Sequence, residues 1–369
     1  MSANAVKKHE PLIHIAKRDA LPWMQSWMIR ILAVIGALIV SAIVTVILTG
    51  ENPIRVYATM IDGAIGTERR IWGLLQNVAM LLCVSLAVTP AFKMRFWNIG
   101  AEGQVLMGGL ATAACMILFG EKMPTALLFP IMAVSSILAG AIWALIPAVF
   151  RAKWNTNETL FTLMMNYIAI QIVSYFMYIW SVPKGSGQIG VINSATKAGW
   201  FPSLGGYSYL LNILIVAALT VFLYIYLKYS KHGYEIAVVG ESENTAKYIG
   251  INVKKVVIRT MLLSGAICGI AGLLLVGGTD HTITRDTAAG RGFTAIIVSW
   301  LAKFNPVYMV LTSLLIVFLE KGALEITTVF GLNSSFSDII TGIIIFFIIG
   351  SEFFINYKVK FKSKKGENA

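Results

Sequence analysis

The chain gathers polar side chains in one short stretch, FWNIGAEGQ (residues 96–104), inside a strongly apolar region. Asn98, Glu102 and Gln104 are separated there by two glycines. Leaving a buried polar group unpaired costs on the order of 1–3 kcal/mol, so these side chains need protein partners, water or a polar solute. Carboxylate and amide groups beside a helix start can hold backbone N–H groups, and the helix start itself can meet the hydroxyl groups of a neutral molecule.

A second polar group lies in NTNETLFTLMMNYIA, residues 155–169. Asn157 is expected to cap a helix that has Glu158 in its first turn. Thr162 and Asn166, four residues apart, then share one face of that helix. A buried asparagine in such a helix has two interpretations, a hydrogen bond between helices and a contact with a bound molecule.

Enzymatic chemistry finds no support in the sequence. The histidines are scattered over three loops, and no HExxH, GxSxG or CxxC motif occurs. The sequence contains no Gly-Lys dipeptide, which excludes a phosphate-binding loop of the GxxxxGK[ST] type. The three cysteines lie in apolar runs without paired spacing, which indicates buried thiols rather than a disulfide framework or a zinc site.

Composition places these residues in a membrane. Of the 369 residues, 57% are hydrophobic and 13% are charged, against about 25% charged in an average soluble domain. A bilayer core of about 30 Å needs roughly 20 apolar residues per helix. The sequence therefore predicts an all-α, polytopic transmembrane bundle of about ten spans, at 28–49, 72–92, 102–119, 125–150, 160–182, 208–228, 257–278, 292–303, 306–321 and 336–355. The eighth run is short enough for a half-helix.

Charge sets the orientation of the spans. With the N-terminus in the cytoplasm, the inner segments hold most of the lysines and arginines and account for the whole net charge of +12. Both termini are therefore predicted to be cytoplasmic, and nucleic acid is not needed to explain the basic balance. The chain divides into a cytoplasmic segment 1–27, a membrane domain 28–355 containing an inner loop 229–256, and a basic tail 356–369.

This topology permits two five-span halves of inverted orientation, an architecture found in transport proteins. Helix breaks are expected near 96–104 and 290–305. The first break is either a turn at the inner surface or the lining of a polar path, because irregular backbone at membrane depth is tolerated only where protein or water covers it. Asn98 is expected to cap the helix that follows, and Glu102 either borders the path or satisfies N–H groups at that helix start.

Small residues in the seventh span predict close helix contacts. Gly265 and Gly269 form a GxxxG pattern in SGAICGIAGLLLVGG, and Gly272 continues the same small face. Such a face lets helix backbones approach closely.

With these motifs, the chain resembles the permease subunits of bacterial ABC importers, in the branched-chain amino acid and monosaccharide permease superfamily and, within it, the nucleoside permeases. FWNIGAEGQVLMGG is similar to the subgroup's Asn-Ile-Gly-x-Glu-Gly-Gln motif, and NETLFTLMMNYIA resembles its second motif. VVGESENTAKYIGINVKKVVIRTMLLSGAICGIAGL resembles the superfamily's coupling loop and following helix, and GRGFTAIIVSWLAKFNP resembles the stretch before the ninth span. Departures are Thr245, where alanine is common, and SWLAKFNP, where a glycine-rich turn is usual.

The resemblance implies a transport subunit that is no enzyme and has no cofactor of its own. Its partners would be ATP-binding subunits that carry ATP and magnesium, a second homologous or identical permease, and an extracytoplasmic binding protein or lipoprotein at the bacterial plasma membrane. The solute would be a nucleoside. Docking of the ATP-binding subunit is expected at Gly240, Glu241, Asn244, Ala246 and Gly250. The substrate path is expected to be lined or braced by Phe96, Trp97, Asn98, Glu102, Gln104, Asn166 and Phe293, with the aromatic rings stacking on the base.

Two alternatives stay open. The first is a permease for a ribose-like monosaccharide, although the sugar permeases replace NIGAEGQ with a different Gly-Asp-Ser-containing stretch. The second is an ion-coupled secondary carrier. Such carriers usually keep acidic residues deep in their spans, whereas nearly all carboxylates here lie at span ends. Transport is therefore expected to be independent of a proton or sodium gradient.

Overall fold

The computed structural model describes residues 13–18 and 21–361, and residues 1–12, 19–20 and 362–369 lie outside the described part. Parts of the predicted N-terminal segment 1–27 and of the predicted tail 356–369 therefore lie outside the described residues.

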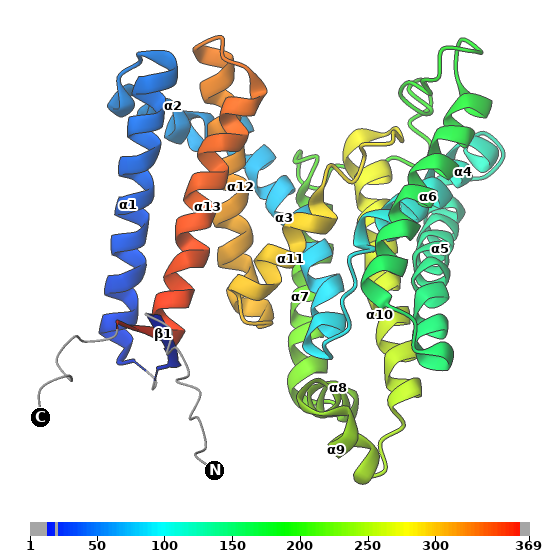
Figure 1. The fold of residues 1–369 in the computed structure, drawn as a ribbon. Helices are drawn as coiled ribbons and strands as arrows, with labels where there is room; N and C mark the ends of the chain where they lie inside the picture. The colour runs from blue at the N-terminus through cyan, green and yellow to red at the C-terminus, as the bar shows by residue number, and fades with distance from the viewer. Residues whose placement is uncertain (1–12, 19–20, 362–369) are drawn as a thin grey trace, which may run out of the picture. The chain divides into compact units, whose positions relative to one another are not determined.

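Within the described residues, nine helices are long and apolar enough to cross a membrane (Figure 1). They are α1 (Trp23–Thr49), α3 (Glu68–Lys93), α4 (Ala101–Phe119), α5 (Thr125–Trp154), α6 (Glu158–Trp180), α7 (Leu210–Tyr229), α10 (Val253–Leu275), α12 (Pro306–Val329) and α13 (Ser334–Asn356). The remaining elements are short: β1 (Ile13–Lys17), α2 (Pro53–Ile65), α8 (Lys231–Glu241), α9 (Glu243–Tyr248), the π-helical turn η1 (Val276–Asp280), α11 (Arg291–Leu301) and β2 (Tyr357–Phe361). The predicted all-α membrane bundle is confirmed.

The predicted span 292–303 is the half-helix α11. It has 11 residues, and at about 1.5 Å per residue it covers roughly half of a bilayer core. Within the described residues, the nine long helices and this half-helix match the predicted runs, the eighth of which was short enough for a half-helix.

The predicted inner loop 229–256 is mostly helical. The hydroxyl oxygen of Ser230 accepts the N–H of Gly233 at the start of α8, and Ser242 does the same for Thr245 at the start of α9. Each serine satisfies a backbone donor that the first helical turn leaves without a partner. The loop therefore presents two capped helices rather than an irregular chain.

The described chain forms two compact units, and the boundary between them falls within α12. The terminal unit contains the described residues up to Gly66 and those from Leu319 onward, and the central unit runs from Thr67 to Phe318. Each unit is held by its own contacts.

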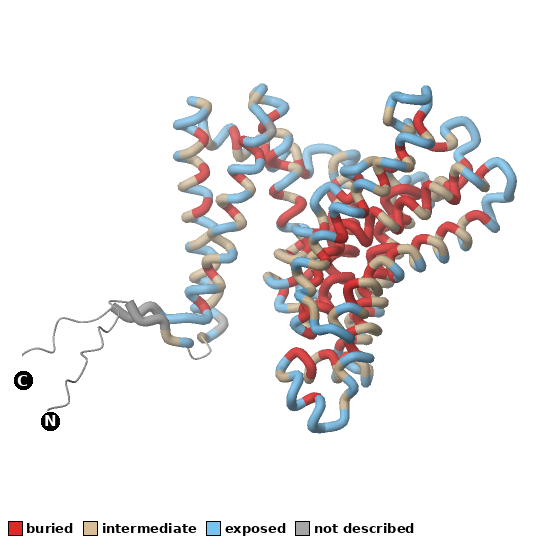
Figure 2. The backbone as a smooth tube through the Cα atoms, turned by 45° about the vertical axis from the view of Figure 1, so that its right-hand side comes forward, coloured by how far each residue is buried: buried red, intermediate tan, exposed pale blue. Residues whose placement is uncertain are grey.

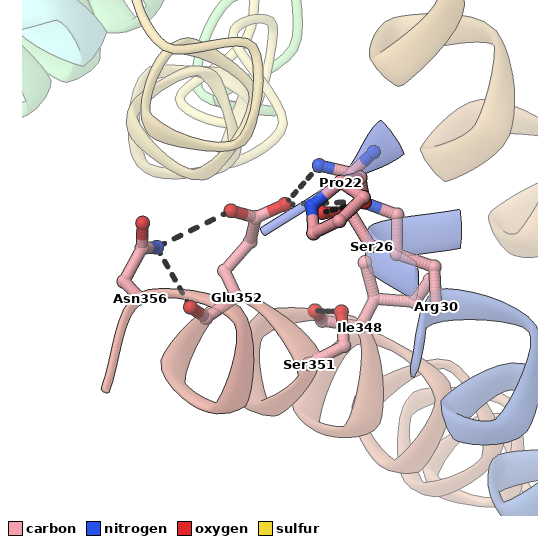
Figure 3. Close-up of polar contacts among 7 residues, drawn as sticks. All are labelled: Pro22, Ser26, Arg30, Ile348, Ser351, Glu352 and Asn356. Atoms are coloured by element: carbon pink, nitrogen blue, oxygen red, sulfur yellow. Dashed lines mark hydrogen bonds and ion pairs between the residues drawn. The ribbon is translucent and has the colours of Figure 1, made fainter. Parts of the chain in front are cut away.

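In the terminal unit, α1 packs against α13, and β1 pairs with β2 in antiparallel register. An ion pair joins the two helices near their β-strand ends (Figure 3), since Nη2 of Arg30 lies 2.6 Å from Oε1 of Glu352. Nδ2 of Asn356 donates to the Glu352 carbonyl one turn earlier. In the described residues, the first and last helices are thus joined by helix packing, by the strand pair and by the ion pair between Arg30 and Glu352.

In the central unit, α3, α4 and α10 are mostly buried, whereas most residues of α5, α6 and α7 are half-buried or exposed. Figure 2 shows the buried residues of this unit gathered at its centre. Glycines let the buried helices approach closely: a Cβ added at Gly108 would lie 2.6 Å from Cα of Gly269, and one added at Gly140 would lie 2.8 Å from the same atom. Both glycines of the GxxxG pattern and Gly272 lie against neighbouring helix backbone.

Candidate functional site at the helix breaks

The first helix break lies deep among the helices of the central unit. The chain is non-helical from 94 to 100, and Figure 1 traces this cyan stretch as it turns back beside α10. Nδ2 of Asn98 donates to the hydroxyl oxygen of Ser264 at 3.1 Å. Ser264 lies about 16 Å along α10 from its start, at 1.5 Å per residue. The structure therefore favours a break at membrane depth over a turn at the inner surface.

Asn166 on α6 binds both sides of this break. Its Oδ1 accepts the N–H of Gly103 at 2.8 Å, and its Nδ2 donates to the carbonyl oxygen of Ile99 at 2.9 Å. The side chain is only 3% exposed. Thr162, one turn earlier, accepts the N–H of Ile99 at 3.2 Å. Of the two interpretations from sequence, the structure shows the hydrogen bond between segments.

Asn98 organises the turn before α4 but does not cap the helix. Its Oδ1 accepts the N–H of Gly100 and an N–H of Gln104, both at 3.1 Å. Gly100 itself holds the N-cap position, so the predicted capping role of Asn98 is wrong. A bond to the N–H two residues on is the local turn that asparagine favours, and it places the helix start further along the chain than expected.

Glu102 joins the two helix breaks. Its Oε1 accepts the N–H of Gly290 at 2.8 Å, and its Oε2 accepts the N–H of Gly292 at 2.7 Å. Gly290 is the N-cap of α11 and provides no side-chain cap. The carboxylate thus satisfies N–H groups at a helix start, as one interpretation expected, but the helix is α11 rather than its own.

The position of Glu102 also has an electrostatic reason. It lies in the first turn of α4 and holds the first turn of α11. Each helix start carries partial positive charge and free N–H donors, so one carboxylate neutralises two positive ends. Gly292 permits the close approach, because a Cβ there would lie 3.0 Å from Cα of Glu102. We refer to Glu102 with Gly290 and Gly292 as the α4–α11 clamp.

Arg291 extends the clamp toward α3. Its Nη2 donates to Oδ1 of Asn77 at 3.1 Å, and its Nη1 donates to the carbonyl oxygen of Thr287 at 3.4 Å. Ionisable residues at membrane depth usually face a polar cavity or the bundle interior. Neither Asn77 nor Arg291 was predicted as a site residue, although an asparagine inside the predicted span 72–92 was a usable signal.

A separate polar cluster lies at the π-helical turn. The amide nitrogen of Gln76 donates to the hydroxyl oxygen of Thr279, and Nδ2 of Asn212 donates to the same oxygen at 3.3 Å. Gln76 is 2% exposed and Asn212 is 1% exposed, and within the described residues their amide oxygens have no hydrogen-bond partner. π-helical turns are frequent at functional sites. Isolated polar residues inside predicted spans were again the signal that sequence analysis left unused.

The segment after α6 covers the π-helical turn. The N–H of Phe201 donates to the carbonyl oxygen of Gly277, and the N–H of Ile192 donates to that of His281. The ring of Trp200 stacks on His281 with centroids 3.8 Å apart. Burial lowers the pKa of His281, although its backbone hydrogen bond to Val276 acts in the opposite direction.

The three aromatic side chains predicted for the path differ in exposure. Phe96 is 3% exposed and packs with buried apolar residues, so its ring has no free face for stacking in this structure. Trp97 and Phe293 are 44% and 46% exposed. Trp97 instead lies beside Trp300 of α11, with ring centroids 5.9 Å apart.

The residues expected to dock an ATP-binding subunit divide into buried and exposed ones. Ala246 is fully buried, and Gly240 packs against the backbone of Lys93. Glu241, Asn244 and Gly250 are exposed. The buried pair anchors α8 and α9 to the central unit, and the exposed residues face outward.

Residues 70–349 match the family described as branched-chain amino acid transport system, permease component. The chain is 29% identical to the glucose ABC transporter permease protein TsgB13 of Haloferax volcanii, over 94% of this chain and 93% of that protein. It is 28% identical to the guanosine ABC transporter permease protein NupP of Bacillus subtilis, over 92% and 98% respectively. It is also 28% identical to the nucleoside ABC transporter permease protein NupB of Lactococcus lactis subsp. cremoris, over 87% and 90%.

Proposed function

Because the chain belongs to the family of permease components of branched-chain amino acid transport systems, we propose that it moves nucleosides inward across a bacterial plasma membrane. It is a multi-pass membrane protein and a transporter subunit of the ABC type rather than an enzyme. Both termini are placed in the cytoplasm in this proposal, because that orientation puts the lysine and arginine excess inside.

The observation that carries the proposal is the α4–α11 clamp. It fixes the start of α11 against the start of α4 in the central unit, and helices broken in this way line solute sites in transporters. Amide groups of Asn98, Gln104 and Asn166 surround the same break. Glu102, the carboxylate buried at this break, is engaged by backbone N–H groups, and the amide groups around it suit a neutral, hydroxylated solute.

The relatives support a nucleoside as the solute. NupP and NupB are named for guanosine and nucleosides, and the exposed rings of Trp97 and Trp300 offer flat apolar faces of the kind that stack on bases. TsgB13, named for glucose, is equally similar and makes a monosaccharide the second candidate.

In this proposal, transport is driven by ATP hydrolysis on partner subunits. The sequence lacks a GxxxxGK[ST] loop, so ATP and magnesium are assigned to separate ATP-binding subunits. A second permease chain, identical or homologous, and an extracytoplasmic binding protein complete the proposed importer. The site carboxylate, Glu102, accepts two backbone N–H groups, which supports a structural role for it over ion exchange.

The test uses membrane vesicles that contain the permease with its partner subunits and enclose ATP. Uptake of a labelled nucleoside is expected to continue after a proton and sodium ionophore is added, and to stop when ATP is omitted. Uptake that collapses with the ionophore while ATP is present would favour the ion-coupled carrier.

The docking surface on α9 gives a second prediction. Tyr248 is 93% exposed beside the exposed Ile249, and a large aromatic ring in this position is typical of an interface anchor. Tyr248→Ala is expected to lower solute-stimulated ATP hydrolysis by roughly tenfold or more, since truncating such an anchor costs about 2 kcal/mol. Hydrolysis is measured on the purified importer.

Tyr178→Ala is the matched control, because Tyr178 is also well exposed, at 67%, but lies on α6. It is expected to leave hydrolysis unchanged. Equal co-purification and equal hydrolysis for both variants would show that α9 is only a solvated segment.

A further inference from the structure

An apolar groove runs between α1 and α13 in the terminal unit. Its volume is about 730 Å³. The apolar side chains that line it are Ile29, Leu32, Ala33, Phe346, Phe347 and Phe354. Leu32 is 60% exposed and Phe346 is 72% exposed, so the described residues leave large apolar surfaces uncovered there.

Two basic side chains line the same groove at its β-strand end. Arg18 follows β1 and Lys358 lies in β2, and both belong to the groove lining. The strand pairing holds this end in place, since Ala16 lies opposite Lys358. Nη1 of Arg18 donates to the carbonyl oxygen of Phe354 at 3.2 Å, which fixes the guanidinium beside the last turn of α13.

The carboxylate of Glu352, on the same helix as the groove-lining Phe354, is paired with another arginine. Glu352 is directed to Arg30, as Figure 3 shows, with Oε1 accepting from Nε at 3.1 Å and from Nη2 at 2.6 Å. That pair is internally neutral. The described residues that line the groove include no acidic side chain, so Arg18 and Lys358 give this lining two positive charges.

The groove follows the last turns of α13 and the first turns of α1. Phe346 lies about 15 Å along α13 from its end at Asn356, at 1.5 Å per residue, and Ile29 lies about 9 Å along α1 from its start at Trp23. The basic residues lie beside these helix ends, which we place among the lipid headgroups because α1 and α13 are long and apolar enough to cross a bilayer.

We propose that this groove binds one anionic phospholipid. The phosphate and headgroup lie at Arg18 and Lys358, and one acyl chain lies along the phenylalanine-lined part between α1 and α13. Basic pockets between transmembrane helices near the cytoplasmic surface bind acidic lipid headgroups in this manner. An apolar helix of another protein would fill the groove without using the two cations, so the charge favours the lipid.

The experiment places the full chain in phosphatidylcholine vesicles that contain a small fraction of spin-labelled phosphatidylglycerol or, in parallel, spin-labelled phosphatidylcholine. The immobilised fraction of each label is measured. The wild-type chain is expected to immobilise phosphatidylglycerol preferentially. In Arg18→Gln with Lys358→Gln, the preference is expected to fall by roughly fivefold for each charge removed.

Lys17→Gln is the charge control, because Lys17 is exposed on the neighbouring strand position and does not line the groove. It is expected to retain the preference. A double variant that keeps the wild-type preference, or a Lys17 variant that loses as much, would overturn the proposal.

A second variant tests the apolar part without touching any charge. Gly350 lines the groove, and a Cβ added there meets no other atom within 4 Å, so Gly350→Leu is expected to fold and to occupy the groove. The number of immobilised phosphatidylglycerol molecules per chain is expected to decrease by about one. Gly342→Leu is the matched control, since Gly342 lies on the same helix, is equally open and does not line the groove.

If the two glycine variants immobilise the same fraction of labelled phosphatidylglycerol, the proposal is contradicted. A Gly350→Leu chain that releases a co-purifying subunit while its lipid labels are unchanged would also contradict it, because the groove would then be a protein interface. Neither result depends on nucleoside transport, so the lipid site and the proposed function fail separately.

Discussion

Glu102→Gln is expected to reduce nucleoside uptake by at least roughly tenfold at equal membrane abundance. The two carboxylate oxygens of Glu102 each accept one backbone N–H at the start of α11. Hydrogen bonds to a charged group contribute about 1.5–3 kcal/mol each, and about 1.4 kcal/mol corresponds to tenfold. Glutamine keeps one oxygen and turns an NH₂ donor toward the other N–H, so α11 loses its fixed start.

Uptake is measured in the vesicles described above, with abundance matched by quantitative blotting. Glu121→Gln serves as control, because Glu121 is exposed in the turn between α4 and α5, and it is expected to transport at the parental rate. If the Glu102→Gln variant transports at the parental rate, the hydrogen bonds of the α4–α11 clamp are not needed for transport.

Gly269→Ala is expected to destabilise the central unit strongly. A Cβ at Gly269 would lie 2.8 Å from the carbonyl carbon of Ser136 and 3.1 Å from Cα of Ile137, both backbone atoms of α5. Inserting a methyl group into such packing costs about 1–3 kcal/mol, and about 2 kcal/mol lowers the Tm of a domain this size by roughly 4–8 °C. The measurement is thermal unfolding in detergent.

Gly73→Ala provides a control of opposite sign. Gly73 lies inside α3, where an added Cβ meets nothing within 4 Å. Alanine is favoured over glycine inside a helix by about 0.5–1 kcal/mol, so the Tm is expected to stay equal or to rise. Equal Tm changes for the two variants would mean that α10 can move away from α5 at little cost.

Local features of the chain were predictable from the sequence because their causes are local. Asn157 caps α6 through the N–H of Leu160, as its place before Glu158 predicted. The length of the run 292–303 was enough to indicate a half-helix. Span positions followed from apolar runs, because crossing a bilayer requires a fixed number of apolar residues.

The partners of the polar side chains could not be predicted in the same way. Glu102 holds N–H groups of Gly290 and Gly292, which lie on a distant segment of the sequence. A single sequence does not show which helix start meets which carboxylate. Gln76 and Asn212, whose amide oxygens are unpaired in the described residues, meet at a π-helical turn. No local sequence pattern predicts that turn.

The central claim is that this permease carries nucleosides, and competition for uptake tests it most directly. Vesicles containing the permease, its partner subunits and ATP are given labelled guanosine together with an excess of unlabelled guanosine, uridine or glucose. Uptake of the label is expected to fall with either nucleoside and to remain unchanged with glucose. If excess glucose lowers the uptake of labelled guanosine, the account is contradicted. The same holds if labelled guanosine does not enter the vesicles while labelled glucose, tested in parallel, does.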